Sequence, residues 1–79
     1  MSERSVRVYS NPLCAPCEAL KADLRARGVD FTVVDPMMDE DAADFLEDRN
    51  IRTTPVMVVG EEIHVGYDPA QVAAIFDSR

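Results

Sequence analysis

Two cysteines, Cys14 and Cys17, are the residues whose type and spacing most directly indicate chemistry in this chain. They lie three residues apart in "NPLCAPCEALKADLRARG", residues 11–28, and no other cysteine occurs. The residues that follow are rich in Ala, Leu, Lys and Arg and predict a helix from Ala15 to Arg27, which stops at Gly28. Both thiols therefore stand where a helix begins.

Three roles for the cysteine pair can be compared: a metal site, inert packing and a reversible dithiol. A structural zinc site takes four ligands, and two thiols with one histidine are too few within one chain. Inert cysteines are often buried, but a C-x-x-C pair at the mouth of a helix is seldom accidental. At that position the helix dipole favours a thiolate on Cys14, the attacking nucleophile, and Cys17 one turn along can resolve the mixed disulfide. The spacing therefore favours redox exchange.

Short strands and two further helices are predicted around this pair. "SVRVYS", residues 5–10, alternates like a strand, and "DFTVV", residues 30–34, is rich in β-formers. Ala42, Phe45 and Leu46 form the apolar stripe of a second helix.

A hairpin and a capped helix are predicted for the rest of the chain. "PVMVVGEEIHV", residues 55–65, turns at Gly60-Glu61, and Asp68 with Pro69 begins the last helix. A right-handed crossover makes the first two strands parallel. The order β-α-β-α-β-β-α thus predicts an α/β fold, a four-stranded mixed sheet with helices on both faces, in a single domain over residues 1–79.

Composition narrows the classes of function. A net charge of −7, from 8 basic and 15 acidic residues, argues against nucleic acid as a partner. No apolar run approaches the roughly 18 residues of a membrane span. The N-terminal residues lack the apolar core of a signal peptide, so we expect a cytoplasmic protein, where a lone cysteine pair is redox-active rather than structural. Six acids between Asp39 and Asp48 form either a solvated helix face or a docking surface for a basic partner.

Three further motifs connect the chain to a known family. "VYSNPLCAPC" after a strand, "TTP" before the third strand and "GYDP" before the last helix together resemble the glutaredoxins, closest to the NrdH-type redoxins. The resemblance covers roughly residues 5 to 77. It implies a thioredoxin-like fold of the glutaredoxin type and a dithiol–disulfide oxidoreductase, an electron carrier that reduces protein disulfides in cell redox homeostasis.

The same resemblance assigns roles to residues of this chain. Cys14 matches the catalytic nucleophile and Cys17 the resolving cysteine. Pro55 matches a cis-proline that faces the cysteines, and Thr54 precedes it, where backbone groups bind the extended chain of the substrate. Tyr9, at the end of the first strand, either covers the dithiol or packs in the core.

At the positions that bind glutathione, the chain departs from the family pattern. Gly66, Tyr67 and Asp68 match the loop where many glutaredoxins hold the γ-glutamyl end of glutathione, and Arg52 matches either a basic glutathione contact or a plain surface arginine. Asn11 replaces a basic residue of many relatives, and Asp68 stands where NrdH-type relatives carry an arginine-like residue. Both departures disfavour anionic glutathione.

The resemblance also implies partners. No tightly bound cofactor and no metal are expected beyond the Cys14–Cys17 redox disulfide. Electrons are expected to come from a thioredoxin-reductase-type flavoenzyme or from glutathione, and the expected client is a disulfide-bearing protein such as ribonucleotide reductase. We also expect the protein to be a monomer. The alternatives are a glutathione-dependent glutaredoxin, a redoxin-fold adaptor, or a dimer that holds an iron–sulfur cluster through Cys14. His64 is expected to be a surface residue rather than a proton donor.

Overall fold

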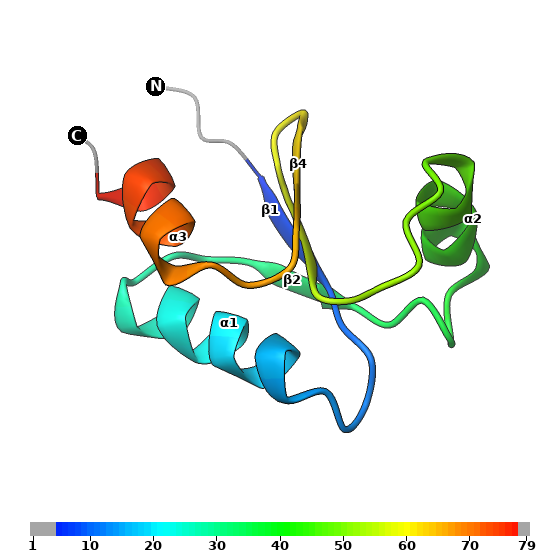
Figure 1. The fold of residues 1–79 in the computed structure, drawn as a ribbon, viewed down its shortest axis with the longest axis horizontal. Coiled ribbons are helices and arrows are strands. Elements are labelled where there is room, and N and C mark those ends of the chain that lie inside the picture. Colours follow the sequence, from blue (N-terminus) through cyan, green and yellow to red (C-terminus); the bar gives the residue numbers. More distant parts are fainter. Residues whose placement is uncertain (1–4, 78–79) are drawn as a thin grey trace.

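The predicted order of strands and helices is confirmed in a computed structural model of the protein, which describes residues 5–77 (Figure 1). The elements are β1 (Val6–Tyr9), α1 (Ala15–Ala26), β2 (Thr32–Val34), α2 (Glu40–Asp48), β3 (Val56–Val59), β4 (Glu62–Val65) and α3 (Pro69–Phe76). The second strand is shorter than predicted, since it begins at Thr32 and Phe31 instead packs against the core.

The four strands form one mixed sheet in the order β2-β1-β3-β4. β1 is parallel to β2 and antiparallel to β3, with Tyr9 opposite Val56. Because antiparallel neighbours run in opposite directions, the end of β1 lies beside the start of β3. The segment that follows β1 and the segment that precedes β3 therefore meet at the same end of the two central strands.

Helices cover both faces of the sheet, as the sequence predicts. α1 and α3 lie on one face and α2 on the other (Figure 1). The first face buries Val6, Val8, Leu20, Leu24, Met57, Val59 and Val72. The second buries Tyr9, Ala42, Leu46, Val56 and Val58. All four residues of β3 are buried, because the strand is covered on both sides.

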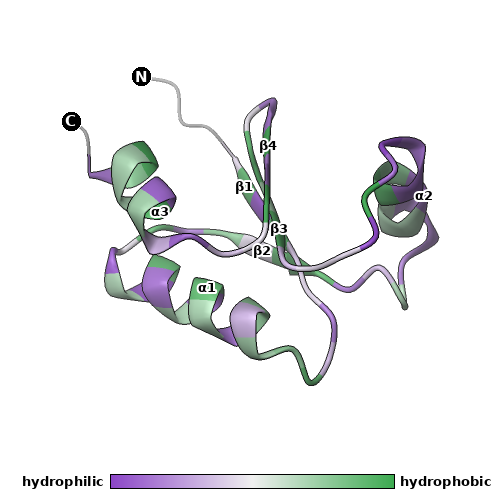
Figure 2. Ribbon diagram, viewed as in Figure 1, coloured by the Kyte–Doolittle hydropathy of each residue, from purple (hydrophilic) through white to green (hydrophobic). Residues whose placement is uncertain are grey.

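Local signals fix the ends of the elements. Gly28, at φ +73°, adopts the left-handed conformation that ends α1, and Gly60, at φ +60°, does the same in the hairpin turn. Asp39 caps α2 by accepting hydrogen bonds from the N–H groups of Asp41 and Ala42. Hydrophilic residues are prominent on α2 (Figure 2), so this helix presents a charged face away from the sheet.

Candidate active site

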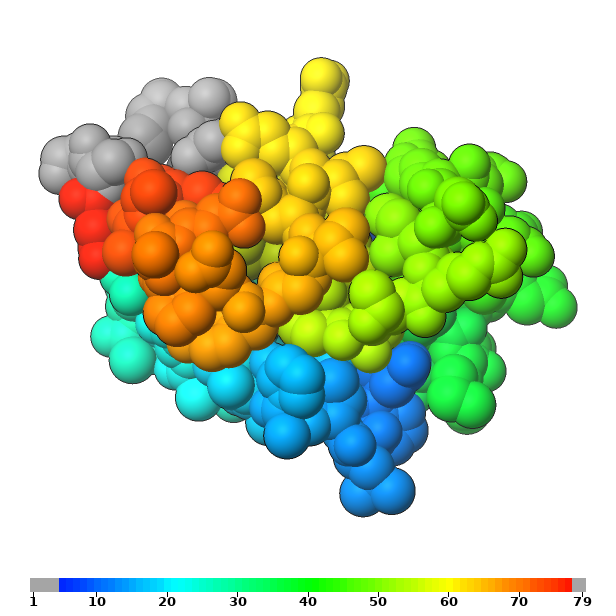
Figure 3. Space-filling view, in the orientation of Figure 1, coloured from blue at the N-terminus to red at the C-terminus, as the bar shows by residue number. Residues whose placement is uncertain are grey.

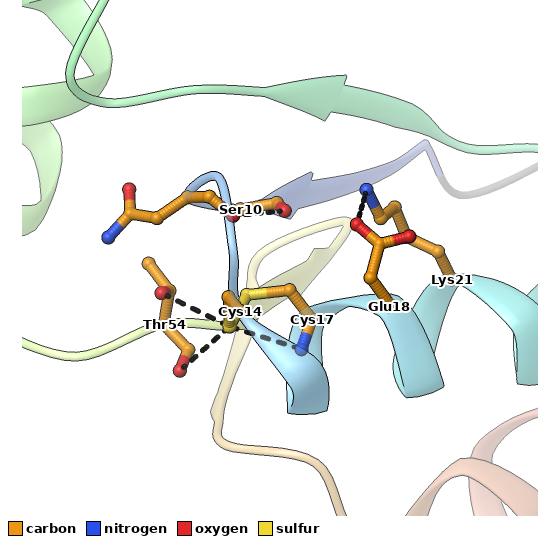
Figure 4. Close-up of polar contacts among 7 residues, drawn as sticks. Ser10, Cys14, Cys17, Glu18, Lys21 and Thr54 are labelled. Atoms are coloured by element: carbon orange, nitrogen blue, oxygen red, sulfur yellow. Dashed lines mark hydrogen bonds and ion pairs between the residues drawn. A yellow bond between two sulfur atoms is a disulfide. The ribbon is translucent and has the colours of Figure 1, made fainter.

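Cys14 and Cys17 are joined by a disulfide at the start of α1 (Figure 4). Their Cα atoms are 5.2 Å apart, within the usual range for a disulfide. Cys14 is the N-cap residue, and its Sγ accepts a hydrogen bond from the Cys17 N–H at 3.2 Å. Cys17 is completely buried, whereas Cys14 is partly exposed. Cys14 is therefore the sulfur that a substrate can reach.

The charges around the first turn of α1 are balanced. Glu18 lies one turn after Cys14, and its carboxylate pairs with the Lys21 Nζ at 2.8 Å (Figure 4). The side chain of Lys21 is only 13% exposed. The ion pair offsets the negative charge of Glu18, so the helix N-terminus retains its capacity to stabilise a thiolate on Cys14.

Thr54 and Pro55 lie against the cysteine pair, as the resemblance implies. The Cys14 Sγ is 3.8 Å from the Thr54 Oγ1 and 4.0 Å from the Thr54 carbonyl oxygen. The Thr54-Pro55 peptide bond is cis, and Pro55 is buried. These residues are forty positions from Cys14 in sequence, and the antiparallel pairing of β1 with β3 brings them together.

The loop of residues 66–68 is joined to Pro55 by its backbone. The Gly66 N–H donates a hydrogen bond to the Pro55 carbonyl at 2.8 Å, and Gly66 has a φ of +85°, which favours glycine. The Tyr67 side chain bonds to α1 instead, where its hydroxyl donates to the Asp23 Oδ2 at 2.8 Å. Asp68 is the N-cap of α3, and its Oδ1 accepts from the Ala70 N–H at 3.0 Å.

Asp23 is the centre of a polar network that the sequence analysis missed. The Arg27 Nε donates to the Asp23 Oδ1 at 2.7 Å, and the Arg27 Nη1 pairs with Asp77. The spacing of Asp23 and Arg27, four residues apart on a helix, was a usable signal for one of these bonds. The bond to Tyr67 spans 44 positions and had no local signal.

The network shifts the pKa of its members. Desolvation by itself raises the pKa of Asp23, but hydrogen bonds from Tyr67 and Arg27 outweigh it, so the net shift is downward. The pKa of Arg27 is raised by its hydrogen bonds to Asp77 and Asp23. The pKa of Tyr67 is raised by its bond to Asp23, because ionising the hydroxyl would remove the donor.

A groove of about 390 Å³ opens beside Thr54, and both Asn11 and Arg52 lie on its wall. Arg52 is exposed, and its Nη2 donates to the Asn50 Oδ1 at 3.3 Å. The Asn11 Oδ1 is buried and has no hydrogen-bond partner among residues 5–77. The two positions considered for glutathione contacts thus flank the same hollow.

Tyr9 and His64 have structural contacts of their own. The Tyr9 ring is buried and stacks on the Phe45 ring at 5.3 Å, so packing is its role. The His64 side chain is 16% exposed and lies 3.3 Å from the Glu62 Oε1. It is therefore more buried than the expected surface residue.

Leu13 is a further feature that sequence reasoning overlooked. It directly precedes Cys14, has a φ of +57°, and is fully exposed. A positive φ is uncommon and strained for a residue with a branched apolar side chain. Strain of this kind is often found at functional sites.

The described residues contain neither a cluster of metal-ligating side chains nor a membrane-spanning helix. Within residues 5–77, no group of at least three His, Cys, Asp or Glu side chains is placed so that it could hold a metal ion. Over the same residues, none of the helices is long and apolar enough to cross a membrane.

Comparison with known proteins identifies the family. The glutaredoxin family model matches residues 6–65. The chain belongs to the glutaredoxin family. It is 36% identical over 74 residues to the Gene 56 protein of Mycobacterium phage L5. The matched stretch covers 91% of this chain and 72% of the phage protein. The chain is 31% identical over 68 residues to the glutaredoxin-like protein NrdH of Salmonella typhimurium. This match covers 86% of this chain and 84% of that protein.

A solved structure agrees with these relatives. The glutaredoxin-like NrdH-redoxin of Escherichia coli, described as having a thioredoxin-like activity profile, superposes with a TM-score of 0.83. It is 25% identical, and the match covers 90% of this chain and 93% of that one. The thioredoxin-like fold and the NrdH-type resemblance are therefore confirmed, and the Cys14–Cys17 pair is the redox-active cysteine pair of a glutaredoxin-like protein.

Proposed function

We propose that this protein is a dithiol–disulfide oxidoreductase that carries electrons to protein disulfides. The observation that supports this most directly is the difference in exposure between the two sulfur atoms. Cys14 is partly exposed at a helix N-terminus, and Cys17 is buried behind it. An accessible thiolate with a protected second thiol is the arrangement that two-step disulfide exchange requires.

In the first step, the Cys14 thiolate attacks one sulfur of the substrate disulfide. The substrate S–S bond breaks, a mixed disulfide forms at the Cys14 Sγ, and the leaving sulfur takes up a proton. In the second step, Cys17 loses its proton and attacks the Cys14 Sγ. The second substrate sulfur leaves as a thiol, so the substrate gains two electrons and the protein becomes the Cys14–Cys17 disulfide.

The substrate chain is proposed to lie across Thr54 and Pro55. The Thr54 backbone carbonyl is 4.0 Å from the Cys14 Sγ, close enough for a strand bound there to present its sulfur. Gly66 lies beside this segment through its bond to Pro55. We assign Arg52, Tyr67 and Asp68 to the borders of the substrate site, with Tyr67 acting by holding the loop to α1.

We propose a thioredoxin-reductase-type flavoenzyme as the electron donor and a disulfide-bearing protein such as ribonucleotide reductase as the client. The NrdH-type relatives and the acidic Asp68 support this over anionic glutathione. The proposed setting is the cytoplasm, where a reducing environment suits a catalytic cysteine pair, and the proposed state is a monomer that acts as one domain over residues 1–79.

The test of the donor follows NADPH oxidation by a coupled reductase. Oxidised protein is offered to thioredoxin reductase in one reaction and to glutathione with glutathione reductase in another. Rapid NADPH consumption with thioredoxin reductase is expected. Efficient reduction by glutathione alone would show instead that the protein is a glutathione-dependent glutaredoxin.

The test of the two cysteine roles uses single substitutions. Cys14→Ser is expected to abolish disulfide reduction, because the accessible nucleophile is lost. Cys17→Ser is expected to accumulate as a mixed disulfide with the substrate, visible as an added mass. Equal alkylation rates of the two thiols at neutral pH in the reduced protein would contradict the assignment.

The alternative of an adaptor or cluster-holding dimer has its own readout. A cluster held through Cys14 would colour the freshly purified protein and absorb in the visible range, and the protein would elute as a dimer. A colourless monomer that reduces disulfides agrees with the proposed oxidoreductase.

A further inference from the structure

The groove beside Thr54 is lined by both apolar and polar residues, and Thr54 separates it from the disulfide. Met37, Leu46 and Ile51 are among its lining residues, and the Thr54 Oγ1 lies 3.8 Å from the Cys14 Sγ. In Figure 3 the yellow-green residues before β3 lie between the blue segment that carries the cysteines and the green α2. A chain attached to a disulfide at Cys14 can therefore extend into the groove.

The α2 wall of this groove is acidic. Ala43 and Glu47 line the groove, and Glu40 shares their stripe because residues at i, i+3 and i+7 lie on one helix face. Glu40 and Glu47 are both exposed. They belong to six acids within residues 39–48, a span with no lysine or arginine.

The two arginines nearest to this wall do not neutralise its negative charge. The guanidinium of Arg49 lies 3.8 Å over the Phe45 ring and donates to the Phe45 carbonyl. Arg52 lines the groove and donates to the Asn50 Oδ1. Among the ion pairs of residues 5–77, neither arginine is paired with Glu40 or Glu47, and two positive charges do not balance six negative ones.

We propose that the groove binds a cationic segment of the client protein next to the client's disulfide. An apolar side chain of the segment fills the groove against Leu46 and Ile51, and a neighbouring Lys or Arg faces Glu40 and Glu47. Met37, with 75% of its surface exposed, forms a flexible apolar border. The inference rests on the proposed disulfide reductase function and specifies which disulfides the protein prefers. Segments rich in acidic residues are rejected by the same wall.

The test uses short synthetic peptides, each closed by one disulfide, that differ only at the two residues before the first cysteine. The three pairs are Leu-Lys, Leu-Glu and Gly-Lys. Pre-reduced protein is mixed with each peptide, and the second-order rate constant of peptide reduction is measured at low and high ionic strength. The small neutral bis(2-hydroxyethyl) disulfide serves as the reference substrate.

The Leu-Lys peptide is expected to react on the order of three- to tenfold faster than the Leu-Glu peptide at low salt. This preference is expected to fall at about 1 M salt, where the Debye length is about 3 Å. The Gly-Lys peptide is expected to react more slowly than Leu-Lys, since it cannot fill the groove. Equal rates for the Lys and Glu peptides at low salt would overturn the proposal.

A double variant and a matched control locate the effect. Glu40→Gln with Glu47→Gln removes two charges from the groove wall and is expected to abolish most of the Lys preference. Asp30→Asn with Glu61→Gln removes the same charge from two exposed residues. Asp30 precedes β2, and Glu61 follows Gly60, whose N–H bonds to the Ser5 carbonyl, so both lie at the far end of the sheet.

Each outcome has one meaning. Loss of the Lys preference in the groove variant but not in the control supports the proposal. Equal losses in both variants would show that net charge, rather than the groove, causes the preference, and would overturn it. Failure of the wild-type protein to reduce the neutral reference disulfide would contradict the proposed function itself.

Discussion

Asp68 carries two separable properties, a hydrogen bond that caps α3 and a negative charge near the substrate loop. Its Oδ1 accepts one bond from the Ala70 N–H at 3.0 Å, and α3 is only eight residues long. Replacing an N-cap Asp by Ala costs about 1 kcal/mol, whereas Asn is nearly as good a cap as Asp. Asp68→Ala and Asp68→Asn therefore remove the same charge but only the first removes the cap.

The expected decrease in Tm for a loss of 1 kcal/mol follows from the length of the chain. At about 2.1 cal/mol/K per residue, the entropy of unfolding for 79 residues is about 0.17 kcal/mol/K, so a loss of 1 kcal/mol lowers the Tm by about 6 °C. Asp68→Ala is expected to show this decrease in a thermal melt followed by circular dichroism. Asp68→Asn is expected to lose clearly less. Equal decreases in both variants would refute the argument that the cap, rather than the charge, stabilises α3.

The charge of Asp68 is tested by the same pair of variants in a glutathione-coupled assay. Removing one exposed repulsion changes the binding free energy by about 0.2–1 kcal/mol, which is a factor of about 1.4 to 5 in rate at low glutathione. Both variants are expected to react with glutathione faster than the wild type by this modest factor. An unchanged rate in Asp68→Asn would show that the charge does not disfavour glutathione.

Three further substitutions test other parts of the structure. Because the pKa of Asp23 is lowered in the folded state, its carboxylate stabilises the protein above the unfolded value of about 3.9, and this contribution is lost as the pH falls. The Tm difference between wild type and Asp23→Asn is therefore expected to narrow below about pH 4, and a constant difference down to pH 2 would contradict the network. Leu13→Asn is expected to raise the free energy of unfolding by about 0.5–1 kcal/mol in urea, since Asn tolerates a positive φ, and a less stable variant would refute the strain. Leu24→Ala, at a completely buried side chain, is expected to cost about 2–5 kcal/mol in urea denaturation, and a cost below about 1 kcal/mol would be inconsistent with its packing.

Much of the architecture could be predicted because its signals are local. The C-x-x-C spacing at a helix start, the Asp68-Pro69 cap and the Gly60 turn are each legible within a few residues. The parallel pairing of β1 with β2 followed from the crossover rule, and the antiparallel pairing of β3 with β4 followed from the hairpin, whereas the pairing of β1 with β3 was not predicted. The cis bond before Pro55 came from the family resemblance, since nothing in the local sequence distinguishes it from a trans bond.

The features that could not be predicted depend on contacts between distant segments. The bond from Tyr67 to Asp23 joins a loop to a helix, and no periodicity in either segment indicates it. The start of β2 was misjudged because Phe31 is β-favouring but packs beside the core instead. The positive φ of Leu13 follows from the path that the chain takes from β1 into α1, against the preference of leucine itself.

The capping role of the Cys14 sulfur has a consequence for the reduction potential of the disulfide. The atom that accepts the Cys17 N–H at the start of α1 is also the atom that gains charge on reduction, so folding and redox state form one thermodynamic cycle. Any free energy by which the fold favours one redox form over the other must equal a shift in reduction potential, about 30 mV for each 1.4 kcal/mol in a two-electron couple. Unfolding free energies of the oxidised and reduced protein, measured side by side, would therefore report how far the fold displaces the potential of this disulfide from that of the unfolded chain, without any electron donor in the experiment.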